Sequence, residues 1–238
     1  MHNVLLILVL MFGVFVQSLA GFGGPLIAMP LGIMLVSITL AKPVMTIVAW
    51  ITGVVVLITE YRHINWRILL RMVLVMLVGV LAGIWLSSKI QLQFLLILYA
   101  VVVIAIGVKR LFFPSKAQTP PAVQAIALAL AGIMQGLFVS GGSFLGVYAV
   151  SKLPEKQEFR ATVNAVWAII NTVMIGTYYL NGTMTRDVLT VSGIAIVPTL
   201  AAIWLGGYLT KHIRQETFMK LIYLILIVSG IVLLITNL

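Results

Sequence analysis

The sequence predicts an all-α polytopic membrane protein built from two inverted-topology repeats. Three observations predict it: an extreme apolar composition, long apolar runs separated by short polar segments, and matched residues that relate the two halves of the chain. Of the 238 residues, 62% are apolar and 8% are charged, whereas a soluble domain carries about 25% charged residues. So few charges cannot cover a soluble fold of this size, and we expect an integral membrane protein.

Composition excludes several functional classes. The absence of cysteine excludes a disulfide scaffold and thiol or Cys-zinc chemistry. The net charge is +10, but the cations form no basic stripe interleaved with aromatic residues, so we expect no nucleic-acid partner. All acids and histidines lie near the ends of predicted spans or in loops. A membrane hydrolase or metalloenzyme needs such groups inside the membrane, so we expect no enzyme, no metal and no other cofactor.

The apolar segments give the predicted spans. A helix needs roughly 20 apolar residues to cross a bilayer, and charges and turn residues delimit ten segments: 4–20, 25–36, 43–59, 68–87, 93–111, 123–139, 143–152, 160–180, 188–209 and 217–237. Six are full-length crossings, and the other four form two glycine-broken pairs. The legs that follow the breaks reach only about 18 and 15 Å at ~1.5 Å per residue, so neither spans alone. The sequence therefore predicts eight to ten spans, depending on how these legs are counted.

The first segment also has the outline of a secretory signal, with an apolar run followed by Gln17-Ser18-Leu19-Ala20. No Lys or Arg precedes that run, and Gln17 belongs to the repeat described below. We therefore expect this segment to be part of the fold.

Lysine and arginine counts in short loops predict the orientation. In the first half, the 60–67 loop and the 109–121 segment are rich in cations, and the 87–93 loop between them holds only Lys89. In the second half, the 210–217 loop carries Lys211 and Arg214, whereas the 181–187 loop pairs Arg186 with Asp187. Residues 109–121 are therefore expected in the cytoplasm and both termini outside. Corresponding loops of the two halves then face opposite sides of the membrane.

The two halves are also related in sequence. Gln17, Gly23-Gly24 and Lys42 match Gln135, Gly141-Gly142 and Arg160 at an offset of 118, and Ala82–Leu86 matches Ala201–Leu205 at 119. Duplication combined with a reversed charge bias is typical of inverted repeats in secondary transporters. We expect a first repeat over 1–113, a cytoplasmic linker over 114–121 and a second, inverted repeat over 122–238. Each repeat contains a glycine-broken helical hairpin and three further transmembrane helices.

The two breaks are the predicted binding site. They are Gly21-Phe22-Gly23-Gly24-Pro25 and Ser140-Gly141-Gly142-Ser143, and a new helix is expected to start at Pro25 and at Ser143. Irregular backbone at membrane depth is tolerated only where it is buried or faces water. A helix start offers free N–H groups and a positive dipole end, so two starts that converge would bind an anion. The alternative is that the glycines only allow close packing, which we prefer for Gly79-xxx-Gly83, Gly132-xxx-Gly136 and Gly142-xxx-Gly146.

Polar residues in nearby helices are candidate supporting groups. Gln17 and Gln135 either line the site or hydrogen-bond to the broken backbone, since both are costly to bury unpaired. Further candidates share a helix face in each repeat: Asn164, Trp167 and Asn171 in the second, and Thr46 and Trp50 in the first. Lys42 and Arg160 either set orientation or form a pair of anion-attracting entrance residues.

These motifs resemble the sulfite exporter TauE/SafE family over essentially the whole chain. The resemblance is carried by Gly21-Phe22-Gly23-Gly24, by Pro30, and by Gly132-xxx-Gly136-Leu137 before Gly141-Gly142. This chain departs from the usual pattern at Pro25, Val139, Ser143 and Tyr148. The resemblance implies a bacterial inner-membrane transporter that moves sulfite, sulfonates or related small anions and binds them at the glycine breaks.

We therefore expect a secondary transporter, an exporter or permease, that moves a small oxyanion by alternating access. The alternative is a passive small-anion channel. The expected partners are the anionic substrate and the lipid bilayer. The sequence leaves the oligomeric state open, a homodimer included.

Overall fold

The computed structural model of the chain describes residues 2–86, 93–112 and 120–237, and within these ranges every regular element is a helix. The predicted all-α class is confirmed. The helices are α1 (His2–Ala20), α2 (Gly24–Leu35), α3 (Ile38–Thr59), the 3₁₀ turn η1 (Tyr61–His63), α4 (Trp66–Leu86), α5 (Gln93–Phe112), α6 (Pro121–Phe138), α7 (Gly142–Lys152), α8 (Lys156–Leu180), α9 (Arg186–His212) and α10 (Gln215–Asn237). Lys89 and most of the predicted 114–121 linker lie outside the described residues.

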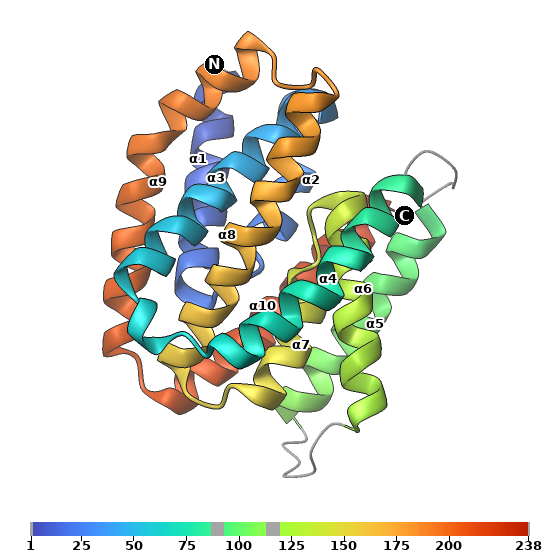
Figure 1. The fold of residues 1–238 in the computed structure, drawn as a ribbon, viewed down its shortest axis with the longest axis vertical. Helices are drawn as coiled ribbons and strands as arrows, with labels where there is room; N and C mark the ends of the chain where they lie inside the picture. The colour runs from blue at the N-terminus through green and yellow to red at the C-terminus, as the bar shows by residue number, and fades with distance from the viewer. Residues whose placement is uncertain (1, 87–92, 113–119, 238) are drawn as a thin grey trace.

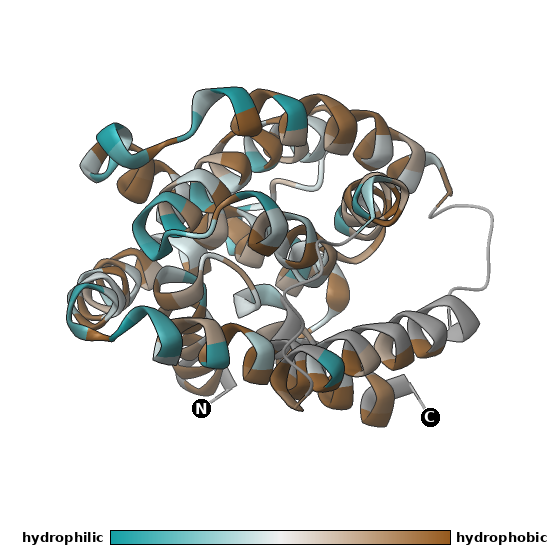
Figure 2. Ribbon diagram, turned by 90° about the horizontal axis from the view of Figure 1, so that it is seen from below, coloured by the Kyte–Doolittle hydropathy of each residue, from teal (hydrophilic) through white to brown (hydrophobic). Residues whose placement is uncertain are grey.

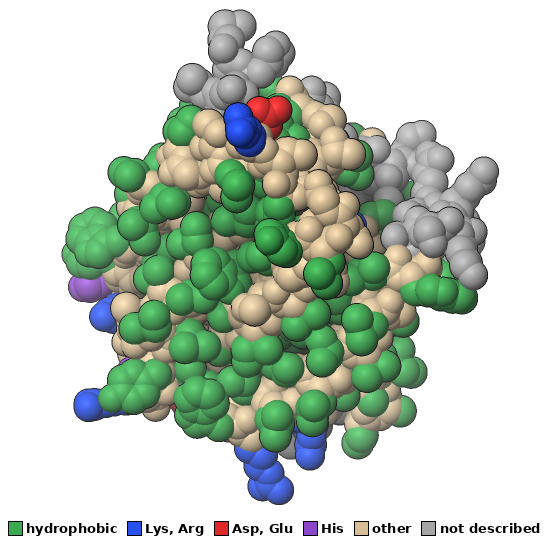
Figure 3. Space-filling model, turned by 45° about the horizontal axis from the view of Figure 1, so that its top comes forward, with side chains coloured by type: hydrophobic (Ala, Val, Ile, Leu, Met, Phe, Trp, Pro, Cys, Tyr) green, Lys and Arg blue, Asp and Glu red, His purple; other side chains and the backbone are tan. Residues whose placement is uncertain are grey.

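Six of these helices are long and apolar enough to cross a membrane, namely α3, α4, α6, α8, α9 and most of α10. Their outward faces are apolar as well: Leu70, Val78, Val197 and Trp204 are all more than half exposed. Figure 3 shows hydrophobic side chains over most of the visible surface. An apolar surface this extensive belongs in lipid. The chain is a multi-pass membrane protein.

Two helices begin earlier than the sequence predicts. α3 starts at Ile38 rather than at residue 43, and α8 starts at Lys156 rather than at residue 160. The prediction takes Lys42 and Arg160 as span ends because a charged side chain normally stays in water. Both charges instead have partners inside the fold, described below, so the helices continue through them.

Helix contacts in the structure have equivalents when each helix is replaced by its counterpart in the other half of the chain. α4 packs against α6 as α9 packs against α1, and the equivalent helices α3 and α8, like α5 and α10, pack against each other. Figure 1 shows α1, α3, α8 and α9 grouped on one side of the molecule and α4 and α6 on the other. This pairing is what a duplication predicts. The inversion of one repeat across the membrane stays a prediction.

The contact between α4 and α6 is made by their glycine motifs. A Cβ atom at Gly83 would lie 2.3 Å from the Ile133 carbonyl oxygen, and one at Gly132 would lie 2.4 Å from the Met76 carbonyl oxygen. The two backbones therefore approach as closely as bare glycine allows, which is the role of small-xxx-small motifs between membrane helices.

Cationic side chains gather at one end of the molecule. There the start of α4 and the α7–α8 and α9–α10 connections meet: Lys156 Nζ donates to the Thr210 carbonyl over 2.9 Å, and Asn65 Nδ2 donates to Glu158 over 2.7 Å. Figure 2, seen from below, shows hydrophilic segments in the connections and hydrophobic helix bodies, and Figure 3 shows Lys and Arg side chains along its lower edge. The charge bias assigns this end to the cytoplasm, and that orientation stays a prediction.

Candidate functional site

The first break joins α1 to α2 by a turn that requires glycine. Gly21 has a φ of 84° and Gly23 a φ of 89°, both in the left-handed region that L side chains rarely adopt. Directly after the turn, a Cβ atom at Gly24 would lie 2.3 Å from the Gly13 carbonyl oxygen on α1. The glycines therefore let α2 fold back against α1, and α2 begins one residue before the predicted start.

The second break joins α6 to α7 and follows the same plan with different residues. Val139, which stands 118 residues after Gly21, is also left-handed, with a φ of 56°. This conformation is strained for a β-branched residue. A Cβ atom at Gly141 would lie 2.0 Å from the Ala131 carbonyl oxygen, so α7 also returns tightly along the helix before it.

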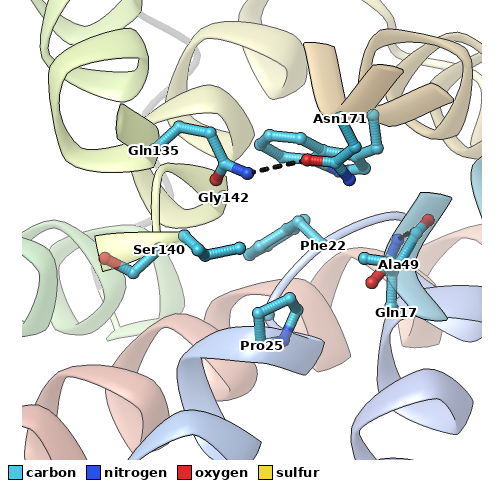
Figure 4. Close-up of a pocket in the computed structure, with 11 residues that line it drawn as sticks. Gln17, Phe22, Pro25, Ala49, Gln135, Ser140, Gly142 and Asn171 are labelled. Atoms are coloured by element: carbon cyan, nitrogen blue, oxygen red, sulfur yellow. Dashed lines mark hydrogen bonds between the residues drawn. The ribbon is translucent and has the colours of Figure 1, made fainter. Parts of the chain in front are cut away.

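The two breaks meet at one central pocket. A Cβ atom at Gly142 would lie 3.1 Å from Phe22 Cβ and 3.3 Å from the Gly23 nitrogen, so the start of α7 touches the first break directly. The pocket residues come from both breaks and from α1, α2, α3, α6, α7 and α8: Gln17, Phe22, Gly23, Pro25, Ala49, Gln135, Val139, Ser140, Gly142, Trp167 and Asn171 (Figure 4). Neither α2 nor α7 has a side chain that caps its N-terminus. The positive ends of two helices therefore lie close to this pocket.

The pocket is nearly closed. Its volume is about 10 Å³, which is room for about one water molecule. A sulfite ion has four heavy atoms and needs more space than this. The side chains around the breaks must therefore separate before a multi-atom ligand can be held.

A hydrogen-bond chain fixes the orientation of two amide side chains at the pocket. The Gly141 N–H donates to Gln135 Oε1 over 3.2 Å, and Gln135 Nε2 donates to Asn171 Oδ1 over 3.0 Å (Figure 4). Because a backbone N–H can only donate, it sets which end of Gln135 accepts and then which end of Asn171 accepts. Asn171 Nδ2 is left buried without a hydrogen-bond partner among the described residues. The network therefore leaves one buried donor on a residue that lines the pocket.

The two glutamines are used differently. Gln135 lines the pocket and also accepts a hydrogen bond from the broken backbone, so both of the roles considered for it apply. Gln17 lines the pocket and donates to the Ala49 carbonyl on α3 over 3.3 Å. Trp167 Nε1 donates to the Gly21 carbonyl over 2.8 Å and so holds the first break against α8.

Other predicted residues lie outside the pocket lining. Asn164 donates to the Arg160 carbonyl one turn earlier in α8, Thr46 donates to the Lys42 carbonyl, and Trp50 donates to Thr172. Gly21, Gly24, Gly141 and Ser143 are buried in or beside the breaks without lining the pocket. The predicted face of α8 therefore reaches the pocket through Trp167 and Asn171, whereas neither predicted residue of α3 lines it.

Lys42 and Arg160 each cap the helix that precedes the opposite break. Lys42 Nζ donates to the carbonyls of Gly136 and Leu137, over 3.4 and 3.0 Å, at the end of α6. Arg160 donates from Nε to the Ser18 carbonyl at the end of α1 and from Nη2 to Ser18 Oγ. The last carbonyls of a helix lack partners within it and attract cations. This crossed arrangement is not foreseen in the sequence analysis, and the entrance role stays a prediction.

Some residues of the site escape sequence reasoning. Phe22 and Val139 lie inside the predicted breaks but carry no polar group that would mark them, and Ala49 is an ordinary apolar residue of α3. Glu60 forms an ion pair with Arg160, whose exposed fraction is only 3%. A comparison of the two halves offers a signal for Glu60. It is an acid at the end of α3, whereas the equivalent position at the end of α8, 118 residues later, carries the neutral Tyr178.

The pocket residues include no carboxylate and no imidazole. The described lining combines neutral donors with the positive ends of two helices. A helical membrane protein with broken helices that meet at a central pocket has the architecture of a secondary transporter.

Comparison with known proteins agrees with this class. The chain belongs to the sulfite exporter TauE/SafE family, whose model matches residues 5–233. A relative from Comamonas testosteroni, described as "Probable inner membrane transporter protein TsaS", is 24% identical over 175 residues, which cover 72% of this chain and 73% of the relative. No solved structure matches the chain significantly. The protein is a membrane transporter of this family.

Proposed function

We propose that the protein is a secondary transporter, an exporter or permease of the bacterial inner membrane, that carries a small oxyanion such as sulfite or an organosulfonate. The anion would bind in the central pocket between the N-termini of α2 and α7. The observation that carries the proposal is Asn171 Nδ2, a buried donor without a partner on a residue that lines this pocket. A ligand with acceptor oxygens supplies what that donor lacks. We expect no enzymatic activity.

The nearly closed pocket supports alternating access. A pocket with room for about one water cannot conduct a sulfonate in this conformation. Transport then requires the breaks to separate toward one side at a time, as in transporters that are built from inverted repeats. The expected orientation has both termini outside and residues 109–121 in the cytoplasm.

The donor is tested by Asn171→Leu, which keeps the approximate size of the side chain and removes its amide group. A hydrogen bond to a charged group contributes about 1.5–3 kcal/mol, so affinity for sulfite should fall by about 10- to 150-fold. The measurement is sulfite binding to the purified protein by titration calorimetry, followed by uptake into proteoliposomes. Thr52→Val is the matched control, because it also removes a buried polar group, one that bonds only to the Val48 carbonyl within α3. Equal affinities of Asn171→Leu and the parent would exclude this site.

The channel alternative is separated by counterflow. Proteoliposomes preloaded with unlabelled sulfite should accumulate labelled sulfite transiently if the protein alternates between two states. A channel shows no such acceleration and no saturation with concentration. A flux that rises linearly with sulfite concentration and does not saturate would support the channel instead of the transporter.

A further inference from the structure

A second hollow lies beside the central pocket, at the end of the molecule opposite the cation-rich loops. We call it the vestibule. Its volume is about 310 Å³, and its polar lining includes Thr39, Lys42, Thr177, Tyr178, Asn181 and Thr183. Gln135 and Met174 separate the two spaces: Gln135 lines the central pocket, Met174 lines the vestibule, and Gln135 Nε2 lies 3.7 Å from Met174 Sδ. The vestibule is large enough for a sulfonate and adjoins the proposed binding site.

The vestibule contains a positive charge with no acid beside it. An ammonium has three N–H donors, and Lys42 gives two of them to the Gly136 and Leu137 carbonyls. Over the described residues the third donor has no protein partner, and the vestibule lining includes no Asp or Glu. A buried or half-buried cation is normally paired. The charge of Lys42 is therefore available to a negative ligand.

The matching position of the other half is built differently. Arg160 caps α1 as Lys42 caps α6, but Arg160 also pairs with Glu60 and is 3% exposed. The residue that corresponds to Glu60 on the Lys42 side is Tyr178, which is neutral and lines the vestibule. Arg160 is neutralised by a carboxylate inside the fold, whereas Lys42 faces an open hollow whose lining includes no acid.

We propose that the vestibule is a second anion site, in which Lys42 holds a small oxyanion such as a sulfonate before it enters or after it leaves the central pocket. The proposal rests on the proposed function, because the adjoining pocket is taken as the transport site. It assigns the attraction of the anion to Lys42 and to the end of the molecule where Lys42 lies, whereas the charge of Arg160 is neutralised by Glu60.

Local charge is measured by thiol labelling, since the chain has no cysteine of its own. A Thr177→Cys variant places one thiol in the vestibule. Its rates of reaction with the anionic 2-sulfonatoethyl and the cationic 2-(trimethylammonium)ethyl methanethiosulfonate are compared in the purified protein. The rate with the anionic reagent divided by the rate with the cationic reagent does not depend on how accessible the thiol is, and it reports the local charge. Adding Lys42→Gln, which keeps an amide donor for the α6 carbonyls, should lower the ratio by about threefold or more at low salt, whereas Lys42→Arg should preserve it.

Matched variants control this measurement. Gln157→Cys places the thiol on the exposed surface of the opposite end, where Lys42→Gln should leave the ratio unchanged. If Lys42→Gln fails to fold, Tyr178→Glu introduces on this side the acid that Arg160 has on the other, and it should lower the ratio in the same way. A ratio at Thr177→Cys that neither change alters overturns the proposal.

Protection by a ligand separates the vestibule from the central pocket. Methanesulfonate, which does not react with thiols, should slow labelling of Thr177→Cys in the parent and also in Asn171→Leu, and should lose this effect with Lys42→Gln. Protection that survives Lys42→Gln but disappears with Asn171→Leu overturns the vestibule site and leaves the central site standing. Protection that disappears only with Lys42→Gln supports the vestibule even if sulfite transport is not observed.

Discussion

The same substitution should have opposite effects at two glycines of this fold. Gly83 lies on α4, where a Cβ atom would come within 2.3 Å of the Ile133 carbonyl oxygen on α6, whereas a Cβ atom at Gly176 on α8 meets nothing within 4 Å. Changing each to alanine adds one methyl group to a helix. At Gly83 the methyl group enters the close contact between α4 and α6, and at Gly176 it enters open space.

The magnitudes follow from these contacts. The Gly83 methyl is about 1 Å short of an ordinary van der Waals contact, so α4 and α6 must move apart. Overpacking of this kind costs typically about 1–3 kcal/mol, and alanine's better helix propensity offsets up to ~1 kcal/mol of it. Gly176→Ala keeps the propensity gain alone. For a chain of this size about 1 kcal/mol corresponds to roughly 2–4 °C in Tm.

The assay is thermal unfolding of the purified protein in one detergent, at one heating rate, because membrane proteins often unfold irreversibly. Gly83→Ala should lower the apparent Tm by several degrees, and Gly176→Ala should leave it unchanged or raise it slightly. Shifts of equal sign and size at the two positions would refute the close packing of α4 on α6.

Three further predictions concern the ion pair, the first break and the topology. Glu60→Gln leaves the Arg160 guanidinium buried without its counter-charge. Breaking a buried pair costs about 3–5 kcal/mol, and we expect the lower end of this range because Glu60 is 16% exposed. The apparent Tm should therefore fall by roughly 6–12 °C. Trp167→Phe removes the donor to the Gly21 carbonyl and should cost about 1–3 kcal/mol, clearly more than Trp50→Phe, whose partner Thr172 is exposed; equal melting temperatures for the two variants would contradict the role given to Trp167. Reporter fusions after Pro120 and after Leu238 should lie on opposite sides of the membrane, and same-side signals would remove the inversion.

The breaks could be placed from the sequence almost to the residue. α2 and α7 begin at Gly24 and Gly142, one residue before the expected starts. This precision has a physical cause, because a left-handed turn and a return along the preceding helix both require glycine, and glycine clusters are visible in a sequence. Val139 shows the limit of that signal, since it adopts the left-handed conformation without being glycine.

The rest of the site could not be predicted because periodicity gives a face but not a depth. Asn164, Trp167 and Asn171 share one face of α8, yet only Trp167 and Asn171 line the pocket. Lys42 and Arg160 show a second limit, because the sequence predicts that they set orientation or attract an anion and does not indicate a partner inside the fold. Their partners are carbonyls of Gly136, Leu137 and Ser18, which lie about a hundred residues away or more in the sequence. No local pattern indicates such a pairing.

The crossed caps have a consequence for how the two halves of the chain depend on each other. Each half carries a helix end whose carbonyls are satisfied by a cation of the other half: Lys42 serves α6 and Arg160 serves α1. Taken alone, either half would keep a helix end with unpaired carbonyls and a cation without its partner. Each half therefore completes the other, and we expect neither half to be stable when it is expressed without its counterpart.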